Sequence, residues 1–264
     1  MNKTGALIPR PPRSRHQRSM RGLLGRIVEE IGLRVLNGAC APGEALPIEQ
    51  ELMAELDVSR TVLREATKIL EAKGLVETRP KTGTRVRPRE QWNLLDPMVL
   101  HLYCRVADYP AFAISFQQIR VLIEPEAAAL AAEHRNRVQL KALKDAYLAM
   151  EASADIKSWT AADLRFHEAI LDATGNPFMR PLGALISTAL ETLLAHSFKN
   201  SANPFESLEV HRRVLDAIRQ RDSIEARERM KALLASTALS ISRTIRSERR
   251  YVAASVSFAP FRAQ

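Results

Sequence analysis

The sequence lacks the features on which several common protein classes depend. Only two cysteines occur in 264 residues, Cys40 and Cys104, and they lie far apart without metal-ligand spacing. This excludes a disulfide framework and suits a reducing compartment. No long apolar run indicates a membrane span, and residues 1–20 have no apolar segment of the kind found in a secretory signal. We therefore expect a cytoplasmic protein without a membrane partner.

Signatures of catalysis are also missing. The sequence contains no phosphate loop, no nucleophile elbow and no general base at a defined spacing. These absences favour a binding protein over an enzyme.

Positive charge is unevenly distributed along the chain. The net charge is +9; residues 1–89 carry 17 Lys or Arg and 10 Asp or Glu, whereas residues 90–264 carry 22 and 20. A basic front third joined to a nearly neutral remainder is typical of a nucleic-acid-binding module attached to a second domain.

The most informative stretch runs from Leu46 to Val86. Apolar spacing predicts a short helix over 49–56, a tight turn, and a second helix that begins after Ser59, whose hydroxyl suits an N-cap. Two β-prone runs then flank Gly83. The pattern predicts a helix-turn-helix followed by a β-wing.

The second of these helices carries cations on one exposed face. Arg60, Arg64 and Lys68 recur every four residues, and Ser59 and Thr61 add hydroxyls to its first turn. Such a helix can offer guanidinium groups to guanine bases and N–H groups to phosphates. Periodicity alone leaves open a solvated basic face with no DNA contact.

A family resemblance favours the DNA-binding alternative. The run PGEALPIEQELMAELDVSRTVLREATKILEAKGLVETRPKTGTRV resembles the DNA-binding domain of the GntR superfamily of bacterial transcription regulators. The resemblance implies operator contacts at Ser59, Arg60, Thr61 and Arg64, with Gly83 and Thr84 at the wing tip. Gln50 stands where some members place a phosphate-binding Arg, and Lys81-Thr82 replaces a common Gly-Arg pair.

The remaining segments suggest a five-part organisation. We expect a disordered basic arm over 1–20, the winged-helix domain over 21–88, a linker over 89–96, an all-α effector domain of about seven helices over 97–250, and a non-helical tail over 251–264. Pro125 is expected to kink or split the helix that contains it.

One pair in the helical part has metal-ligand spacing. Asp163 and His167 lie four residues apart and so share a helical face from which both can reach one divalent ion, and His211 can join them from another helix. An i,i+4 pair is more often only a surface pair.

A second resemblance bears on this pair. IRVLIEPEAAALAAEH, DLRFHEAILDATGNP and EVHRRVLDAIRQRD are similar to the FCD domain of the FadR subfamily. It implies Zn²⁺ or Ni²⁺ bound by Asp163, His167 and His211, but Leu233 occupies the place of the usual fourth ligand. A pocket without metal, in which the histidines bind an anion directly, remains the alternative.

The same resemblance suggests effector-binding residues. It implies that Arg120 meets the carboxylate of an effector, whereas spacing alone allows an intrahelical pair with Glu124. Asn176 and Ser207 are weaker candidates for hydroxyl recognition, and Asn176 can instead cap the next helix.

These observations lead to a functional hypothesis. QWNLLDPMVL and the missing fourth His resemble repressors of galactonate and related sugar-acid operons. We expect a homodimeric repressor that binds double-stranded operator DNA and is relieved by a small carboxylate such as an aldonate or uronate. The alternatives are a regulator responding to another hydroxy or organic acid, a metal-dependent enzyme and a nonspecific chromosome-binding protein.

Overall fold

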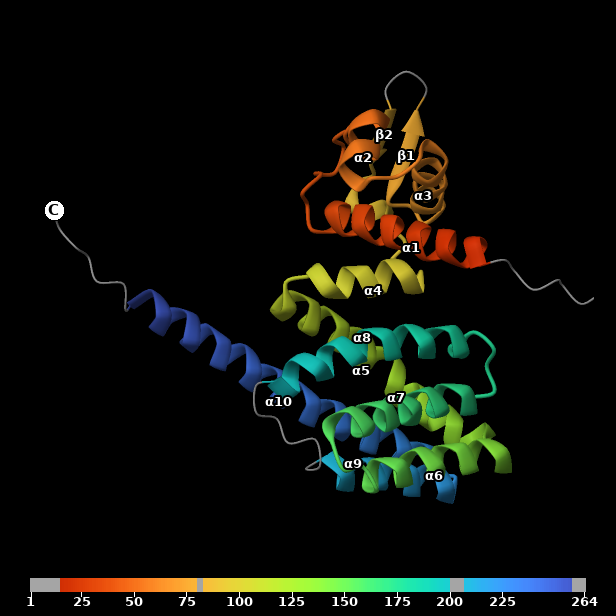
Figure 1. The fold of residues 1–264 in the computed structure, drawn as a ribbon. Helices are drawn as coiled ribbons and strands as arrows, with labels where there is room; N and C mark the ends of the chain where they lie inside the picture. Colours follow the sequence, from red (N-terminus) through yellow and green to blue (C-terminus); the bar gives the residue numbers. More distant parts are fainter. Residues whose placement is uncertain (1–14, 80–82, 200–206, 258–264) are drawn as a thin grey trace, which may run out of the picture. The chain divides into compact units, whose positions relative to one another are not determined.

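The chain forms two compact units that divide between Val106 and Ala107 (Figure 1). The computed structural model describes residues 15–79, 83–199 and 207–257. The elements of the first unit are α1 (Arg15–Leu36), α2 (Glu49–Leu56), α3 (Arg60–Ala72), β1 (Val76–Arg79), β2 (Gly83–Val86), the 3-10 helix η1 (Arg89–Gln91) and α4 (Pro97–Val106). Those of the second are α5 (Tyr109–His134), α6 (Arg137–Glu151), α7 (Ile156–Ala173), α8 (Met179–Lys199), α9 (Leu208–Gln220) and α10 (Ser223–Ser257).

The first unit is the expected winged helix-turn-helix. α1 packs against α3, and β1 pairs antiparallel with β2, with Val76 opposite Val86 and Arg79 opposite Gly83. Gly83 has a φ of 78°, a conformation that a residue with a side chain rarely adopts. The prediction of a helix-turn-helix followed by a wing is therefore confirmed.

Local sequence explains where α2 and α3 meet. α2 ends at Asp57, which adopts the left-handed conformation, and Ser59 caps α3 by accepting a hydrogen bond from the Val62 N–H at 3.4 Å. The inner face of α3 is apolar and is buried in the domain core, which comprises residues such as Ile31, Val35, Leu63, Ala66, Leu70, Leu75 and Val86. Burial of this face orients the opposite, basic face toward solvent.

The connector after the wing belongs to the first unit. Trp92 is buried in its core and donates from Nε1 to the Arg87 carbonyl at 3.0 Å. α4 also packs on α1, where Gly32 lacks the Cβ that would otherwise come within 2.8 Å of Leu102. The structure thus groups α4 with the DNA-binding part, ten residues beyond the start at residue 97 that the sequence suggested for the effector domain.

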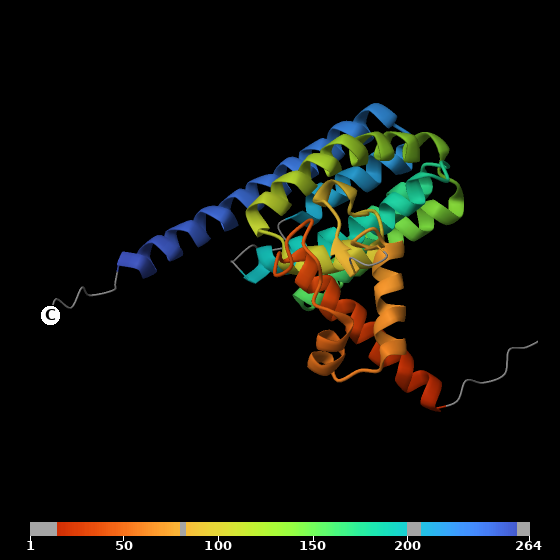
Figure 2. The same cartoon turned by 90° about the horizontal axis from the view of Figure 1, so that it is seen from above.

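The second unit is an all-α bundle (Figures 1 and 2). α5 packs along α10 and also contacts α7 and α9, while α7 packs between α6 and α8. Seven helices follow Asp96 in the described part of the chain, as expected, but α4 is not among the bundle helices. Pro125 lies inside α5, which continues without interruption from Tyr109 to His134, so the helix is not split.

Two terminal expectations differ from the structure. α1 begins at Arg15, so residues 15–20 are helical and not part of a disordered arm; residues 1–14 lie outside the described residues. α10 extends to Ser257, seven residues into the segment expected to be a non-helical tail. Among the described helices none is long and apolar enough to cross a membrane.

Candidate functional site

The exposed face of α3 presents the residues expected to contact DNA. The side chains of Arg60 and Arg64 are 64% and 60% exposed, and Thr61 is also exposed, while Val62 and Leu63 are buried on the other side. Ser59 and the first N–H groups of α3 lie at the same end. This arrangement places two guanidinium forks and a helix N-terminus on one accessible surface, a combination suited to phosphate and base contacts.

The remaining predicted DNA contacts lie on neighbouring elements. Gln50 is exposed in the first turn of α2, Gly83 is exposed, and Thr84 is half-buried. The Thr84 hydroxyl lies 3.4 Å from that of Thr78 across the wing. Lys81 and Thr82, which replace the common wing-tip pair, lie outside the described residues.

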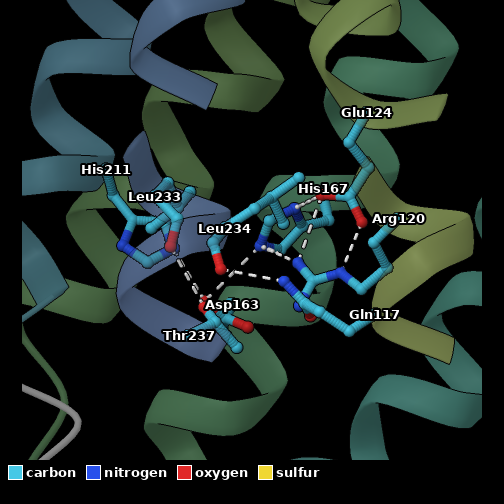
Figure 3. A network of polar contacts seen from close by, with 9 residues as sticks. All are labelled: Gln117, Arg120, Glu124, Asp163, His167, His211, Leu233, Leu234 and Thr237. Carbon is cyan, nitrogen blue, oxygen red and sulfur yellow. Dashed lines mark hydrogen bonds and ion pairs between the residues drawn. The ribbon is translucent and has the colours of Figure 1, made fainter. Parts of the chain in front are cut away.

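A cluster of buried polar side chains forms a second candidate site, inside the bundle. Asp163, His167 and His211 point toward one another from α7 and α9, and Arg120 and Glu124 approach His167 from α5 (Figure 3). All five side chains are buried. We refer to these five residues as the polar cluster. The potential ligand atoms of Asp163, His167 and His211 lie within 4.8 Å of one another.

His211 and Asp163 face each other at short distance inside the polar cluster. The Nδ1 of His211 lies 2.8 Å from the Ser207 carbonyl, which can only accept, so Nδ1 carries a proton. Nε2 lies 2.9 Å from Asp163 Oδ1. This contact is favourable only with a cation shared by the two atoms, either a proton on Nε2 or a metal ion.

His167 is held on the opposite side by an ion pair on α5. Its Nδ1 lies 2.8 Å from Glu124 Oε2, and its Nε2 lies 3.2 Å from Arg120 Nη2 and 3.9 Å from Asp163 Oδ1. Arg120 donates from Nε to Glu124 Oε1 at 2.5 Å. The intrahelical pair that spacing allowed is therefore formed, and Arg120 has an internal carboxylate as its partner.

Both buried carboxylates remain ionised. Burial alone would raise the pKa of Glu124, but the charges and hydrogen bonds of Arg120 and His167 outweigh it and lower this pKa to about 2. Burial also opposes ionisation of Asp163, whose pKa is nevertheless lowered by His211, His167 and Arg120. With neutral imidazoles, the polar cluster carries two negative charges and one positive charge.

The other predicted residues differ in their relation to the polar cluster. Leu233, at the position implied for a fourth ligand, is buried, and its apolar side chain offers no ligand atom. Ser207 contributes its backbone carbonyl to His211.

Asn176 lies on the exposed turn before α8, where its side chain accepts from the Phe178 N–H at 3.0 Å. Asn176 therefore has the local turn role that was its alternative, outside the polar cluster.

Sequence reasoning did not identify Gln117. Its Nε2 donates to the Leu234 carbonyl at 2.8 Å, while its buried Oε1 has no hydrogen-bond partner. Gln117 lies three residues before Arg120 and therefore on nearly the same face of α5. That spacing was the available signal, and the free acceptor makes Gln117 a candidate ligand-binding residue.

Gln117 also lines a groove between α5 and α10. The groove has a volume of about 970 Å³, and its other lining residues include Ile114, Val121, Leu122 and Ile245. The five residues of the polar cluster do not line this groove. The residues of the cluster are at most 3% exposed, so the cluster is closed to solvent.

Comparisons with known proteins define the class of this one. The family described as bacterial regulatory proteins, gntR family, matches residues 23–86, and the FCD domain matches residues 116–236. The chain belongs to the GntR family, as a transcriptional regulator with a DNA-binding winged helix and an FCD effector domain. Members of this family are DNA-binding transcriptional regulators and not enzymes.

Relatives with high coverage support this membership. The chain is 33% identical over 214 residues to the galactonate operon transcriptional repressor of Escherichia coli K12, covering 80% of this chain and 93% of the relative. It is 30% identical over 206 residues to the regulator LutR of Bacillus subtilis 168, covering 76% and 92%.

A solved structure shares the fold. The protein named Lar, described as controlling the agr system of Listeria monocytogenes, matches with a TM-score of 0.62 at 19% identity, covering 84% of this chain and 97% of that one.

Proposed function

We propose that this regulator represses a sugar-acid catabolic operon and that a small carboxylate effector, bound in the FCD domain next to a divalent metal, releases it from operator DNA. The relative at 33% identity, a galactonate operon transcriptional repressor, supports this effector class. The convergence of three buried ligand atoms, from Asp163, His167 and His211 within 4.8 Å of one another, is the observation on which the proposal mainly depends.

The charge balance favours a metal and an anion together. With neutral histidines the polar cluster has a net charge of about −1, which is costly in a protein interior. A divalent ion would change this to about +1, and one effector carboxylate would then neutralise it. Protonation of one histidine would instead give a neutral cluster that has no need of an anion.

The donor set fits such an ion. Two imidazole nitrogens and one carboxylate are ligands that Zn²⁺ and Ni²⁺ accept, and the buried Nε2 of His211 lies 2.9 Å from Asp163 Oδ1. We assign Asp163, His167 and His211 as the metal ligands. Because Leu233 cannot coordinate, positions remain for oxygen atoms of water or of an effector, and the metal would polarise whichever oxygen occupies them.

The α5 side of the polar cluster would recognise the effector. Arg120 can exchange its contact with His167 for an effector carboxylate while keeping its bond to Glu124. The free Oε1 of Gln117 can accept a hydrogen bond from an effector hydroxyl. A hydroxylated carboxylate therefore satisfies both groups, as an aldonate or uronate would. Other hydroxy acids share this chemistry and form the alternative effector class.

Operator recognition would use the exposed face of α3 together with the wing. Arg60 and Arg64, which are exposed on α3, would read bases, and Ser59 and Thr61 would contact phosphates. Gln50, Gly83 and Thr84 would add contacts from α2 and the wing. This division predicts that the arginines carry most of the sequence preference.

We further propose that the regulator acts as a homodimer, because two half-sites supply discrimination that one winged helix cannot. The groove between α5 and α10 is the candidate interface. Ile114, Val121 and Leu122 are 54%, 49% and 71% exposed there. Among the described residues that line it, Arg246 is the one with a charge, so these parts of two copies would meet with little charge repulsion.

A DNA-release assay tests the proposal. A duplex is selected by the protein from randomised DNA, and its binding is followed by fluorescence anisotropy while aldonates, uronates and short hydroxy acids are added with zinc, with nickel or with a chelator. We expect release by one sugar acid only when metal is present. Release by a hydroxy acid that is not a sugar acid would show that the effector belongs to that other class. Equal binding of the selected and random duplexes would favour a nonspecific chromosome-binding protein.

A further inference from the structure

The carboxylate of Glu49 connects the first helix of the DNA-binding motif to the second. Its Oε1 accepts a hydrogen bond from Arg64 Nε at 3.0 Å, and its Oε2 lies 3.7 Å from Arg60 Nε. Arg60 and Arg64 are one helical turn apart on α3, so a single carboxylate contacts both guanidinium groups. Glu49 is therefore in contact with two side chains that lie 11 and 15 residues further along the sequence.

We propose that Glu49 is a positioning residue for operator recognition, which holds Arg60 and Arg64 in the orientation that reads bases and thereby sets the preference for operator over other DNA. The inference rests on the proposed contacts of these two arginines. It goes beyond them by assigning a role to an acidic residue that no DNA contact would require.

The contact atoms support positioning. Glu49 engages the Nε side of each guanidinium, and the paired terminal nitrogens are the atoms that bind guanine in a bidentate manner. An arginine held through Nε keeps its terminal nitrogens for the base. It also loses less side-chain entropy on binding, because part of that freedom is already restricted.

The position of Glu49 on α2 restricts the movement of its backbone. It is the first residue of α2, whose N-terminus favours a negative charge, and Leu52 anchors the same helix in the domain core. The side chain of Glu49 is nevertheless 46% exposed, and those of Arg60 and Arg64 are 64% and 60% exposed. Exposed ion pairs of this kind contribute little to stability, so orientation is the more important consequence.

Charge gives Glu49 a second effect in the same direction. A carboxylate between two cations reduces the attraction of this surface for any phosphate backbone, and nonspecific binding depends almost entirely on that attraction. Specific binding retains the base contacts. Both effects raise the ratio of specific to nonspecific affinity, which is the quantity that matters for a regulator.

Two substitutions separate positioning from charge. Glu49→Ala removes the charge and both acceptors, whereas Glu49→Gln removes the charge and keeps one acceptor oxygen. Glu30→Ala is the matched control, because Glu30 is an exposed carboxylate that pairs with Arg34 on α1. Affinities are measured for the selected duplex and for a random duplex at several salt concentrations.

We expect both Glu49 variants to bind random DNA more tightly than the unaltered protein. The ratio of selected to random affinity should fall by about fivefold or more in Glu49→Ala, with a smaller fall in Glu49→Gln and no change in Glu30→Ala. In an Arg64→Ala background, Glu49→Ala should cause a smaller further loss of the ratio, because one of the two arginines it positions is absent.

Three results would overturn the inference. A ratio that stays constant while both affinities rise would mean that Glu49 acts only through its charge. Equal losses for both duplexes with a lower melting temperature would mean a purely structural role. If Arg64→Ala lowers the ratio and Glu49→Ala does not, the positioning role fails while the DNA contact stands; if neither lowers it, the proposed contact itself fails.

Discussion

Nε2 of His211 lies 2.9 Å from Oδ1 of Asp163 in the core of the FCD domain. Because the Ser207 carbonyl accepts from Nδ1 of the same ring, a further cation, either a proton on Nε2 or a metal ion, has to lie between Nε2 and the carboxylate. The short distance between these two atoms therefore predicts that His211 and Asp163 share a bound cation.

Loss of His211 should remove stabilisation by metal. We expect zinc or nickel to raise the melting temperature of the unaltered protein over that in chelator, because a ligand that binds only the folded state stabilises it. In His211→Ala this difference should disappear. His134→Ala is the control, since His134 is exposed on α5 away from the polar cluster. A metal-dependent shift that persists in His211→Ala would exclude this ligand set.

The two arginines of α3 should carry sequence preference. Arg60→Ala and Arg64→Ala should each weaken binding of the selected duplex by about 1–3 kcal/mol if each reads a base. Lys68→Ala removes a cation from the same helix and should weaken selected and random duplexes alike if it meets only phosphate. Anisotropy titrations at fixed salt measure these changes. An unchanged affinity in both arginine variants would rule out this mode of docking.

Arg120 should be tested with a conservative change. Arg120→Ala would leave Glu124 buried without its main partner, at a cost of about 3–5 kcal/mol, and this loss would obscure any effect on the effector. Arg120→Lys keeps the charge beside Glu124 but loses the bidentate fork. We expect it to bind the selected duplex normally and to require at least about tenfold more effector for release. Normal release would remove Arg120 from the effector site.

A charge on the α5 face should disrupt dimers. Leu122→Glu places a carboxylate in the groove between α5 and α10, where burial against a second copy would be costly. We expect monomers by analytical ultracentrifugation and weaker operator binding. Leu148→Glu on α6 is the control, because Leu148 is 43% exposed outside this groove. Dimers that survive Leu122→Glu would place the interface elsewhere.

The pair of Lys73 and Asp96 should make stability depend on pH. Burial opposes ionisation of Asp96, but Lys73, at 2.5 Å, and the N–H groups of Met98 and Val99 lower its pKa overall. A lowered pKa stabilises the fold above the unfolded value near 3.9, and this stabilisation is lost as pH falls through the folded value.

Asp96→Asn keeps a capping side chain and removes the charge. We expect it to lose about 1 kcal/mol at pH 7, measured by urea unfolding, and the difference from the unaltered protein to shrink below about pH 4. A difference that is constant with pH would show that the charge of Asp96 does not contribute.

Local patterns in the sequence predicted much of the fold. The N-cap at Ser59, the glycine at the wing and the helical periods depend on neighbouring residues, and all were identified. The length of α5 was not identified, because Pro125 is accommodated inside a helix that packs against α7, α8, α9 and α10. The placement of α4 also depends on tertiary packing, because this helix packs on α1.

Part of the polar cluster could likewise be predicted from local sequence, and part depends on tertiary packing. Asp163 and His167 share a helical face by spacing, and resemblance added His211. Spacing also showed that Arg120 could pair with Glu124, but burial of that pair depends on α7 and α9 and is not encoded in α5 alone. The contact of Glu49 with α3 crosses the turn at Asp57 and depends on how α2 and α3 pack.

Asp96 has one further consequence for how a signal could travel. Asp96 accepts hydrogen bonds at the start of α4 and forms an ion pair with Lys73, the C-cap residue of α3. It therefore links these two helices directly. Within the described chain only Ala107 and Asp108 separate α4 from α5. A change in the backbone torsion angles of these two residues would therefore move α4 together with the helix-turn-helix. Regulation by such a change would not require the helix-turn-helix to unfold.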